Sequence, residues 1–256
     1  LSIMSYNNPP NLSFVYQATT FKSIFDTSYM TYDLAALQFM YGKKDPSTLS
    51  DAQAAVLQST QTTTFSAAYR GFETIWAPEG TDLDASQTTS KNIFDLRAGA
   101  YSSIGDSEQD AFTKDLIAGG MSPSTAASYS QSAVKLQSTA NKAKLYSSIN
   151  NTGLAYGSTI SSVKGGTGDD KFFAADYDSS LDGGAGTSDT VYLQGSAEHW
   201  QYKSGGALAA VTPAQTGALS GPDVTLINTI SGIKLTLKDV EKYQFYDASM
   251  SLLHTA

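Results

Sequence analysis

The stretch KGGTGDDKFFAADYDSSLDGGAGTSDTV, from Lys164 to Val191, carries the strongest structural signal in this sequence. Its segment from Gly165 to Phe173 matches the nine-residue repeat G-G-x-G-x-D-x-U-x, in which U is a large apolar residue, at every fixed position. A second copy begins at Gly183 and carries one extra residue before Asp189. The two copies start 18 residues apart, which is two periods of the repeat.

The residue types of these two loops suit a calcium ion. Calcium takes about six to eight oxygen ligands in a flexible geometry. Glycine allows a positive φ and leaves backbone carbonyls exposed on a tight loop, and aspartate adds a charged oxygen. One such loop cannot fill the shell, so two loops must share an ion. The predicted ligands are Gly165, Thr167, Asp170, Gly184, Gly186 and Asp189.

The spacing of the copies also predicts an architecture. In a parallel β-roll whose half-coils are nine residues long, loops 18 residues apart stack directly on one edge. The apolar residues Phe172, Leu181 and Val191 would then point inside. The simpler alternative is a pair of glycine-rich turns between ordinary strands.

The composition limits the class of protein. The 256 residues suffice for one or two domains, and the abundance of Ser, Thr, Gly and Tyr favours strands and turns. The net charge of −8 argues against nucleic acid and suits calcium binding, although solubility alone also explains it. There is no cysteine, no apolar run long enough to span a membrane and no visible signal peptide. The first residue is Leu1 rather than Met, which leaves open that a longer protein exists.

Two segments near the beginning form a second pattern. The string SIMSY occupies Ser2 to Tyr6, and DLAALQFMYG follows from Asp33 to Gly42. Leu34, Leu37 and Tyr41 share one face of a predicted amphipathic helix that ends at Gly42.

This pair of segments resembles the end of the catalytic domain of the serralysin-type zinc metalloproteases, which are metzincins. The resemblance implies that Ser2–Tyr6 form the Met-turn, that Met4 is the methionine under the zinc site, and that Tyr6 is the tyrosine that can reach the zinc. In this family a calcium-binding RTX β-roll follows the helix, in agreement with the repeats found above.

The sequence departs from this family at the zinc site. The family's ligands lie in H-E-x-x-H-x-x-G-x-x-H, upstream of the Met-turn, but the two histidines here, His199 and His254, lie far downstream. Neither has a partner at ligand spacing, so a surface or packing role is favoured for both. A three-histidine site cannot form in this chain alone, and we expect the chain by itself to be inactive.

The region between the two patterns contains further candidates. Residues 72–87 resemble the family's strand and turn at the entrance to the roll, and Glu79 and Asp82 are candidate calcium ligands there. The alternative for these two acids is simple solvation. Residues 107–150 do not fit the repeat and predict an inserted helical hairpin, with one helix ending at Gly119 and a second running from Pro123 to about Tyr146. A partner-binding arm is the alternative role for this hairpin.

The part after Val191 changes to alternating strands separated by turns, which resembles the strand-rich caps of secreted RTX proteins. The final MSLLHTA occupies the place of the family's export signal but lacks the acidic-hydrophobic ending typical of serralysins.

The predicted fold is therefore mainly β: a parallel β-roll with a strand-rich C-terminal cap, preceded by the helical remnant of a metzincin domain and carrying the inserted hairpin. The predicted boundaries are 1–45 for the metzincin end and 46–256 for the roll. The predicted function is the calcium-binding C-terminal portion of a secreted, extracellular zinc metalloendopeptidase, with a protein substrate and an upstream histidine-bearing fragment as partners. The alternative is a non-catalytic calcium-binding surface or adhesion protein.

Overall fold

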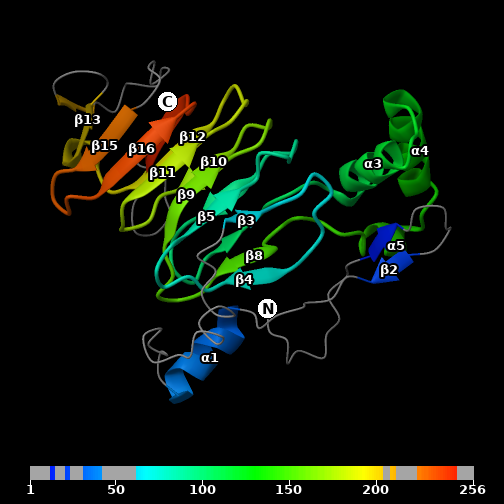
Figure 1. Cartoon of the computed structure of the whole chain (residues 1–256), viewed down its shortest axis with the longest axis horizontal. Coiled ribbons are helices and arrows are strands. Elements are labelled where there is room, and N and C mark those ends of the chain that lie inside the picture. The colour runs from blue at the N-terminus through cyan, green and yellow to red at the C-terminus, as the bar shows by residue number, and fades with distance from the viewer. Residues whose placement is uncertain are drawn as a thin grey trace.

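The computed structural model of the chain describes residues 12–14, 21–23, 31–41, 62–203, 208–211 and 224–246. Two β-sheets, each with parallel strand pairs, are wound from one chain path (Figure 1). Each turn of this path, called a coil below, is a strand in the first sheet, a loop at one edge and a strand in the second sheet. The described residues form a first coil at 81–95, a second at 160–173, a third at 179–194 and a fourth at 234–246.

The strands of these coils pair with their counterparts in neighbouring coils. In chain order they are β5 (Thr81–Asp84) and β6 (Ile93–Asp95), β9 (Ile160–Lys164) and β10 (Lys171–Phe173), β11 (Ser179–Asp182) and β12 (Thr190–Gln194), and β16 (Lys234–Lys238) and β17 (Lys242–Tyr246). The pairs β5·β9, β9·β11 and β11·β16 are parallel, as are β6·β10, β10·β12 and β12·β17. A short strand, β3 (Thr63–Thr64), extends the first sheet beside β5. The chain is therefore mainly β, as predicted.

The register confirms the predicted stacking of the two glycine-rich copies. Leu181 lies opposite Val163 in the first sheet, and Phe172 lies opposite Val191 in the second. The extra residue before Asp189 is taken up in the loop, so the strands on both sides stay paired. Phe172, Leu181 and Val191 are completely buried between the sheets, because alternate strand residues point to the same face.

The C-terminal strands only partly form the separate cap that the sequence predicted. The strands β13 (Trp200–Lys203), β14 (Ala209–Ala210) and β15 (Val224–Asn228) add to the first sheet in antiparallel fashion, after a short 3-10 turn, η2 (Ala197–His199). By contrast, β16 and β17 continue the two parallel sheets as the fourth coil. Their alternating apolar side chains are buried in the same core as those of the earlier coils.

The predicted helical insertion is present, with one correction. The helices are α3 (Glu108–Ala118), α4 (Pro123–Lys135) and α5 (Thr139–Lys142), and they lie at the opposite end of the sheets from β13 and β15 (Figure 1). Ser107 and Ser122 cap the first two helices as N-cap residues. The second helix does not reach Tyr146, because Ser138 accepts the N–H of Asn141 and starts a new helix.

The insertion is packed against the sheets at its base. It leaves and returns through the antiparallel strands β7 (Tyr101–Ser102) and β8 (Thr152–Leu154), and β8 pairs with β4 (Glu73–Ile75). Glu108, only 1% exposed, lies 2.7 Å from the Arg70 guanidinium and accepts the N–H of Phe14 in β1 (Leu12–Phe14). This buried ion pair anchors α3 to the body of the molecule.

The helix predicted from the second N-terminal segment is α1 (Thr31–Tyr41), and a short strand, β2 (Phe21–Ser23), precedes it beside β1. The proposed Met-turn residues Met4 and Tyr6, and the C-terminal MSLLHTA, lie outside the described residues. Among the helices that are described, none has the length and apolarity needed to cross a bilayer.

Candidate calcium site

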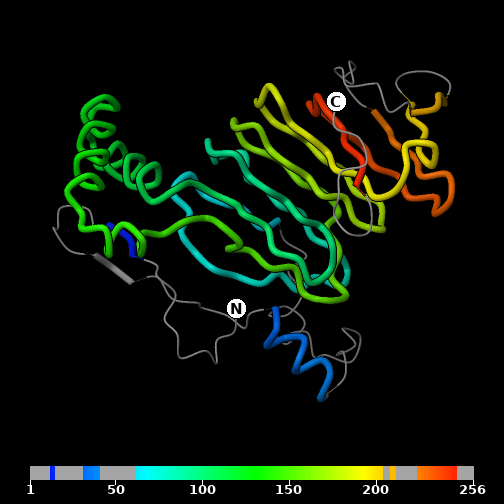
Figure 2. Tube along the Cα trace, turned by 180° about the vertical axis from the view of Figure 1, so that it is seen from behind, coloured from blue at the N-terminus to red at the C-terminus, as the bar shows by residue number. Residues whose placement is uncertain are grey.

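The two glycine-rich loops, 165–170 and 183–189, lie next to each other along one edge of the sheets. Figure 2 shows the loops of successive coils side by side at this edge. Hydrogen bonds join the loops of the second and third coils. The N–H of Ala185 donates to the carbonyl of Gly166 at 2.9 Å, and the N–H of Asp170 donates to Asp189 Oδ1 at 2.6 Å. The structure thus brings together the two aspartates that the repeat singles out.

Glycine is required in these loops because oxygen atoms occupy the space of a side chain. A Cβ at Gly165 would collide with Asp170 Oδ2 and would stand 2.5 Å from the carbonyl oxygen of Gly183. A Cβ at Gly186 would collide with the Asp189 carboxylate and would stand 2.7 Å from the carbonyl oxygen of Gly168. The missing side chains therefore make room for a dense group of oxygens, which is what a hard cation needs.

A row of side chains, the carboxylate ladder, runs along this edge and consists of Asn92, Asp170, Asp189 and Glu241. Each member immediately precedes the second strand of its coil. The backbone N–H of Asn92 donates to Asp170 Oδ1 at 2.6 Å, that of Asp170 to Asp189 Oδ1, and that of Asp189 to Glu241 Oε2 at 2.7 Å. Three acids are therefore stacked in successive coils.

The two central carboxylates of the ladder are completely buried, with 0% exposure. Burial raises the pKa of Asp170 from 3.8 to about 6, against the opposing effect of hydrogen bonds from Asn92 and Gly166. Burial, together with the charges of Asp170 and Glu241, raises the pKa of Asp189 from 3.8 to about 7. Asp189 Oδ2 has no hydrogen-bond partner among the described residues. Such a group is stable only if it is protonated or meets a cation.

In the first coil, the ladder ends with the amide side chain of Asn92 in place of an acid. Asn92 Nδ2 donates to Asp170 Oδ1 and to Thr88 Oγ1, both at 2.9 Å. Outside this contact, Lys91 pairs with Asp169 at 3.0 Å, on the surface. The side of Asp170 that faces the first coil is therefore satisfied by hydrogen bonds alone.

The predicted ligands are only part of the oxygen set at this edge. Gly165, Thr167, Asp170, Gly184, Gly186 and Asp189 do lie in the two stacked loops. The contacts between the loops also involve the carbonyl oxygens of Gly166, Gly168 and Gly183, which were missed. Asn92 and Glu241 were missed as well, because their loops carry no glycine repeat.

The other predicted site residues lie elsewhere. Glu79 is exposed in the turn before β5, and Asp82 Oδ1 accepts the hydroxyl of Ser162 at 2.7 Å. Because the glycine-rich loops follow the ends of the parallel strands, Glu79 is at the opposite edge of the sheet. The structure therefore does not bring it to the ladder, and calcium binding by Glu79 and Asp82 stays a prediction.

No zinc site is found in the described part of the chain. His199 is half-buried and its Nε2 lies 3.7 Å from Glu198 Oε1, while His254 falls outside the described residues. The described residues contain no cluster of three His, Cys, Asp or Glu side chains suited to a metal ion.

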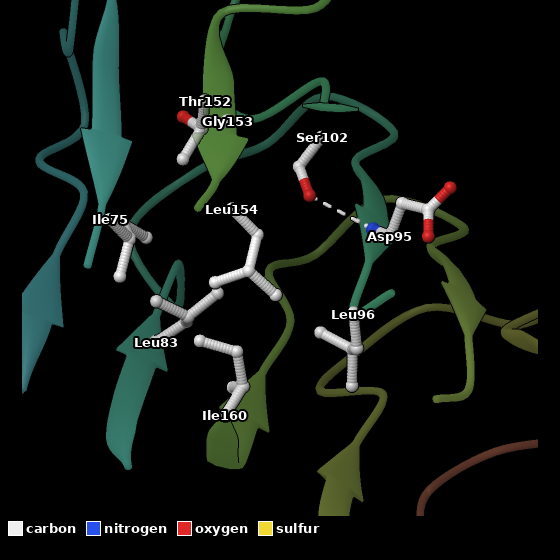
Figure 3. A pocket seen from close by; sticks show the side chains of 9 residues that line it. All are labelled: Ile75, Leu83, Asp95, Leu96, Ser102, Thr152, Gly153, Leu154 and Ile160. Carbon is white, nitrogen blue, oxygen red and sulfur yellow. Dashed lines mark hydrogen bonds between the residues drawn. The ribbon is translucent and has the colours of Figure 1, made fainter. Parts of the chain in front are cut away.

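A small internal cavity lies between the sheets near β8 (Figure 3). Its volume is about 10 Å³, which is room for roughly one water molecule. Figure 3 shows the Asp95 carboxylate pointing away from the apolar lining, and that carboxylate accepts Arg97 Nε at 2.8 Å. The cavity is lined by Ile75, Leu83, Asp95, Leu96, Ser102, Thr152, Gly153, Leu154 and Ile160. It is too small for a substrate.

Comparison with known proteins adds no family assignment. No family model matches this chain, and a search of curated proteins finds no match.

Proposed function

We propose that this chain is a calcium-binding RTX β-roll and that it forms the C-terminal portion of a secreted serralysin-like zinc metalloendopeptidase. The observation that supports calcium binding most strongly is the buried Asp189 carboxylate, one oxygen of which has no partner among the described residues. Burying an anion without a counter-charge is unfavourable by several kcal/mol, so an occupied cation site is the simplest role for it.

The oxygen set fits calcium better than a transition metal. Carboxylates and carbonyls are hard ligands, and neither a histidine nor a cysteine lies in the loops. Asp170 and Asp189 would hold the ion with carbonyl oxygens of the surrounding glycines. The ion supplies two positive charges, which compensate the repulsion between the two acids.

This arrangement makes folding depend on the calcium concentration. Without the ion, repulsion within the ladder opposes the approach of the second and third coils at neutral pH. Extracellular calcium-binding modules have dissociation constants of about 10⁻⁴–10⁻³ M, so a site of this class is filled outside the cell and empty inside it. Calcium entry after export would then drive the coils together, which supports an extracellular role.

The protease assignment rests on the resemblance of Ser2–Tyr6 and Asp33–Gly42 to the metzincin end, and α1 lies where that resemblance requires a helix. The described residues do not provide a zinc site, and we derive no catalytic step from them. The catalytic histidines would come from an upstream segment, with Met4 beneath them and Tyr6 beside the metal. An upstream H-E-x-x-H in the parent protein would support the protease, and its absence there would favour the alternative of a calcium-binding surface or adhesion protein.

Two experiments test this proposal. Thermal unfolding of residues 1–256, followed by circular dichroism, should show a lower melting temperature with a calcium chelator and its recovery with about 5 mM calcium, above the range expected for such modules. Asp189→Asn should abolish most of the calcium response, whereas Asp176→Asn, in an exposed turn at the opposite edge, should retain it. An unchanged melting temperature in the chelator would contradict calcium binding. Zinc content and peptidase activity of the full parent protein separate the protease from the adhesion alternative.

A further inference from the structure

The fourth coil copies the backbone contacts of the third coil although its loop contains no glycine. The N–H of Gly183 donates to the carbonyl of Lys238 at 2.9 Å, as the N–H of Gly165 donates to the carbonyl of Asp182 at 2.7 Å. The loop of the fourth coil is only Asp239, Val240 and Glu241, between β16 and β17. The fourth coil therefore meets the third in the same way as the third meets the second.

The oxygen arrangement is repeated along with the backbone. At Gly165, Asp170 Oδ2 and the carbonyl oxygen of the next coil, that of Gly183, both crowd the place of a Cβ. At Gly183, that place is crowded by Asp189 Oδ2, at 2.7 Å, and again by a carbonyl oxygen of the next coil, that of Asp239. A carboxylate oxygen of one coil thus faces a carbonyl oxygen of the following coil twice in succession.

The carboxylate oxygen beside Gly183 has fewer hydrogen bonds than the equivalent oxygen beside Gly165. Asp170 Oδ2 accepts the N–H of Gly166 at 2.8 Å. The equivalent N–H in the third coil, that of Gly184, donates to Asp182 Oδ1 instead, at 3.0 Å. Asp189 Oδ2 is consequently left buried and without a hydrogen bond in the described structure.

The two lysines that flank the loop of the fourth coil do not compensate this oxygen. Lys238 pairs with Asp182 at 2.7 Å and with Asp239 at 3.1 Å. Lys242 donates to Ser188 Oγ at 2.5 Å. Both ammonium groups are thus bonded to other side chains, and neither is a hydrogen-bond partner of Asp189 Oδ2.

We propose a second calcium site, between the third and fourth coils, formed by the Asp189 carboxylate, the carbonyl oxygen of Asp239 and the Glu241 carboxylate. These are hard oxygen ligands, which suit calcium. The site goes beyond the proposed function, which requires only the ion between the second and third coils. Asp189 belongs to both sites, whereas Asp170 belongs to the first alone and Glu241 to the second alone.

The two sites can be separated by counting calcium ions bound to residues 1–256, by calorimetry and by native mass spectrometry with calcium as the only added ligand. The unmodified chain should bind two ions at this edge, and Glu241→Gln and Asp170→Asn should each bind one fewer. The amide introduced by Glu241→Gln keeps an oxygen that can accept the N–H of Asp189, so folding should be retained, and circular dichroism checks it. Glu198→Gln is the matched control, because the Glu198 side chain is 78% exposed.

The outcomes distinguish this inference from the proposed function. If Asp170→Asn removes an ion while Glu241→Gln binds as many ions as the unmodified chain, the second site is refuted and the first remains. If the unmodified chain binds no calcium, both proposals fail. The number of calcium ions bound by the unmodified chain is measured without any variant. A count of none or of one therefore contradicts the second site even if a variant misfolds.

Discussion

The stability of the calcium-free chain should fall as the pH rises from 5 to 8, which is the reverse of the usual effect of buried salt-bridged carboxylates. Folding raises the pKa of Asp170 to about 6 and of Asp189 to about 7, above the ordinary 3.8. The folded chain therefore binds these protons more tightly than the unfolded chain does. By linkage, the stabilising effect of protonation is present at low pH and is lost as the pH passes through 6 and 7.

The size of the effect follows from the same values. Each pKa unit is worth about 1.4 kcal/mol, so full ionisation in the folded state is unfavourable by roughly 3 kcal/mol at Asp170 and roughly 4 kcal/mol at Asp189. Part of this change occurs below pH 5, so the free energy of unfolding should fall by about 4 kcal/mol between pH 5 and pH 8. Burial also raises the pKa of Glu73 and Glu108, and these groups act in the same direction.

The assay is urea unfolding in a chelator at pH 5 and at pH 8. With a urea m-value of about 2–3 kcal/mol/M, the midpoint should fall by roughly 1.3–2 M between the two conditions. Asp189→Asn should remove more than half of this difference, which separates it from the effects of Glu73 and Glu108. Saturating calcium should abolish the difference by binding the ionised ladder. A calcium-free midpoint that is constant or rises with pH would refute the assignment of the ladder as a set of uncompensated buried acids.

Three other predictions concern single side chains of the loops and of the insertion. Asp170→Asn should weaken calcium binding at least tenfold by calorimetry while Asp176→Asn changes it little; equal affinities would remove Asp170 from the site. Gly183→Ala should lower the calcium-bound melting temperature, because the new Cβ meets the rigid carbonyl of Asp239, and a wild-type value would show that the loop relaxes freely. Glu108→Gln should destabilise the chain by about 1.5–3 kcal/mol in thermal unfolding, since it removes the charged hydrogen bond between Arg70 and its buried partner while the ion pair of Arg70 with Asp115 remains; a change below about 0.5 kcal/mol would be at odds with this.

The sequence was sufficient for the centre of the fold because two signals agree there. The repeat spacing placed the loops in one column, and the apolar residues Phe172, Leu181 and Val191 placed the strands between two sheets. The stacking of Asp170 on Asp189 followed directly from that register. The glycines alone predicted tight loops with exposed carbonyl oxygens. The structure shows the reason, because carbonyl oxygens occupy the places where a Cβ would lie.

The coils on either side of this centre could not be predicted in the same way. The first coil turns through eight residues without glycine, 85–92, and the fourth through three, 239–241, so no repeat marks either of them. The alternation in Lys234–Lys238 and Lys242–Tyr246 predicts strands, but it is the same for a parallel and an antiparallel neighbour. The ends of the ladder, Asn92 and Glu241, were therefore recognisable only once the coils were stacked.

The break between α4 and α5 had a local signal that was overlooked. Ser138 is followed by a helix-compatible segment and accepts the N–H of Asn141, just as Ser122 caps α4. The small, loosely periodic apolar residues of this region did not define how far a single helix extends. Capping serines were more informative there than the apolar pattern.

The most direct test of calcium binding is an anomalous-difference map from crystals of residues 1–256 grown with calcium. We predict an anomalous peak between the loops 165–170 and 183–189, bonded to the Asp189 carboxylate and to carbonyl oxygens of the loop glycines. Clear electron density for both loops at saturating calcium, with no anomalous peak and with Asp189 Oδ2 bonded only to water or to protein, would contradict the account.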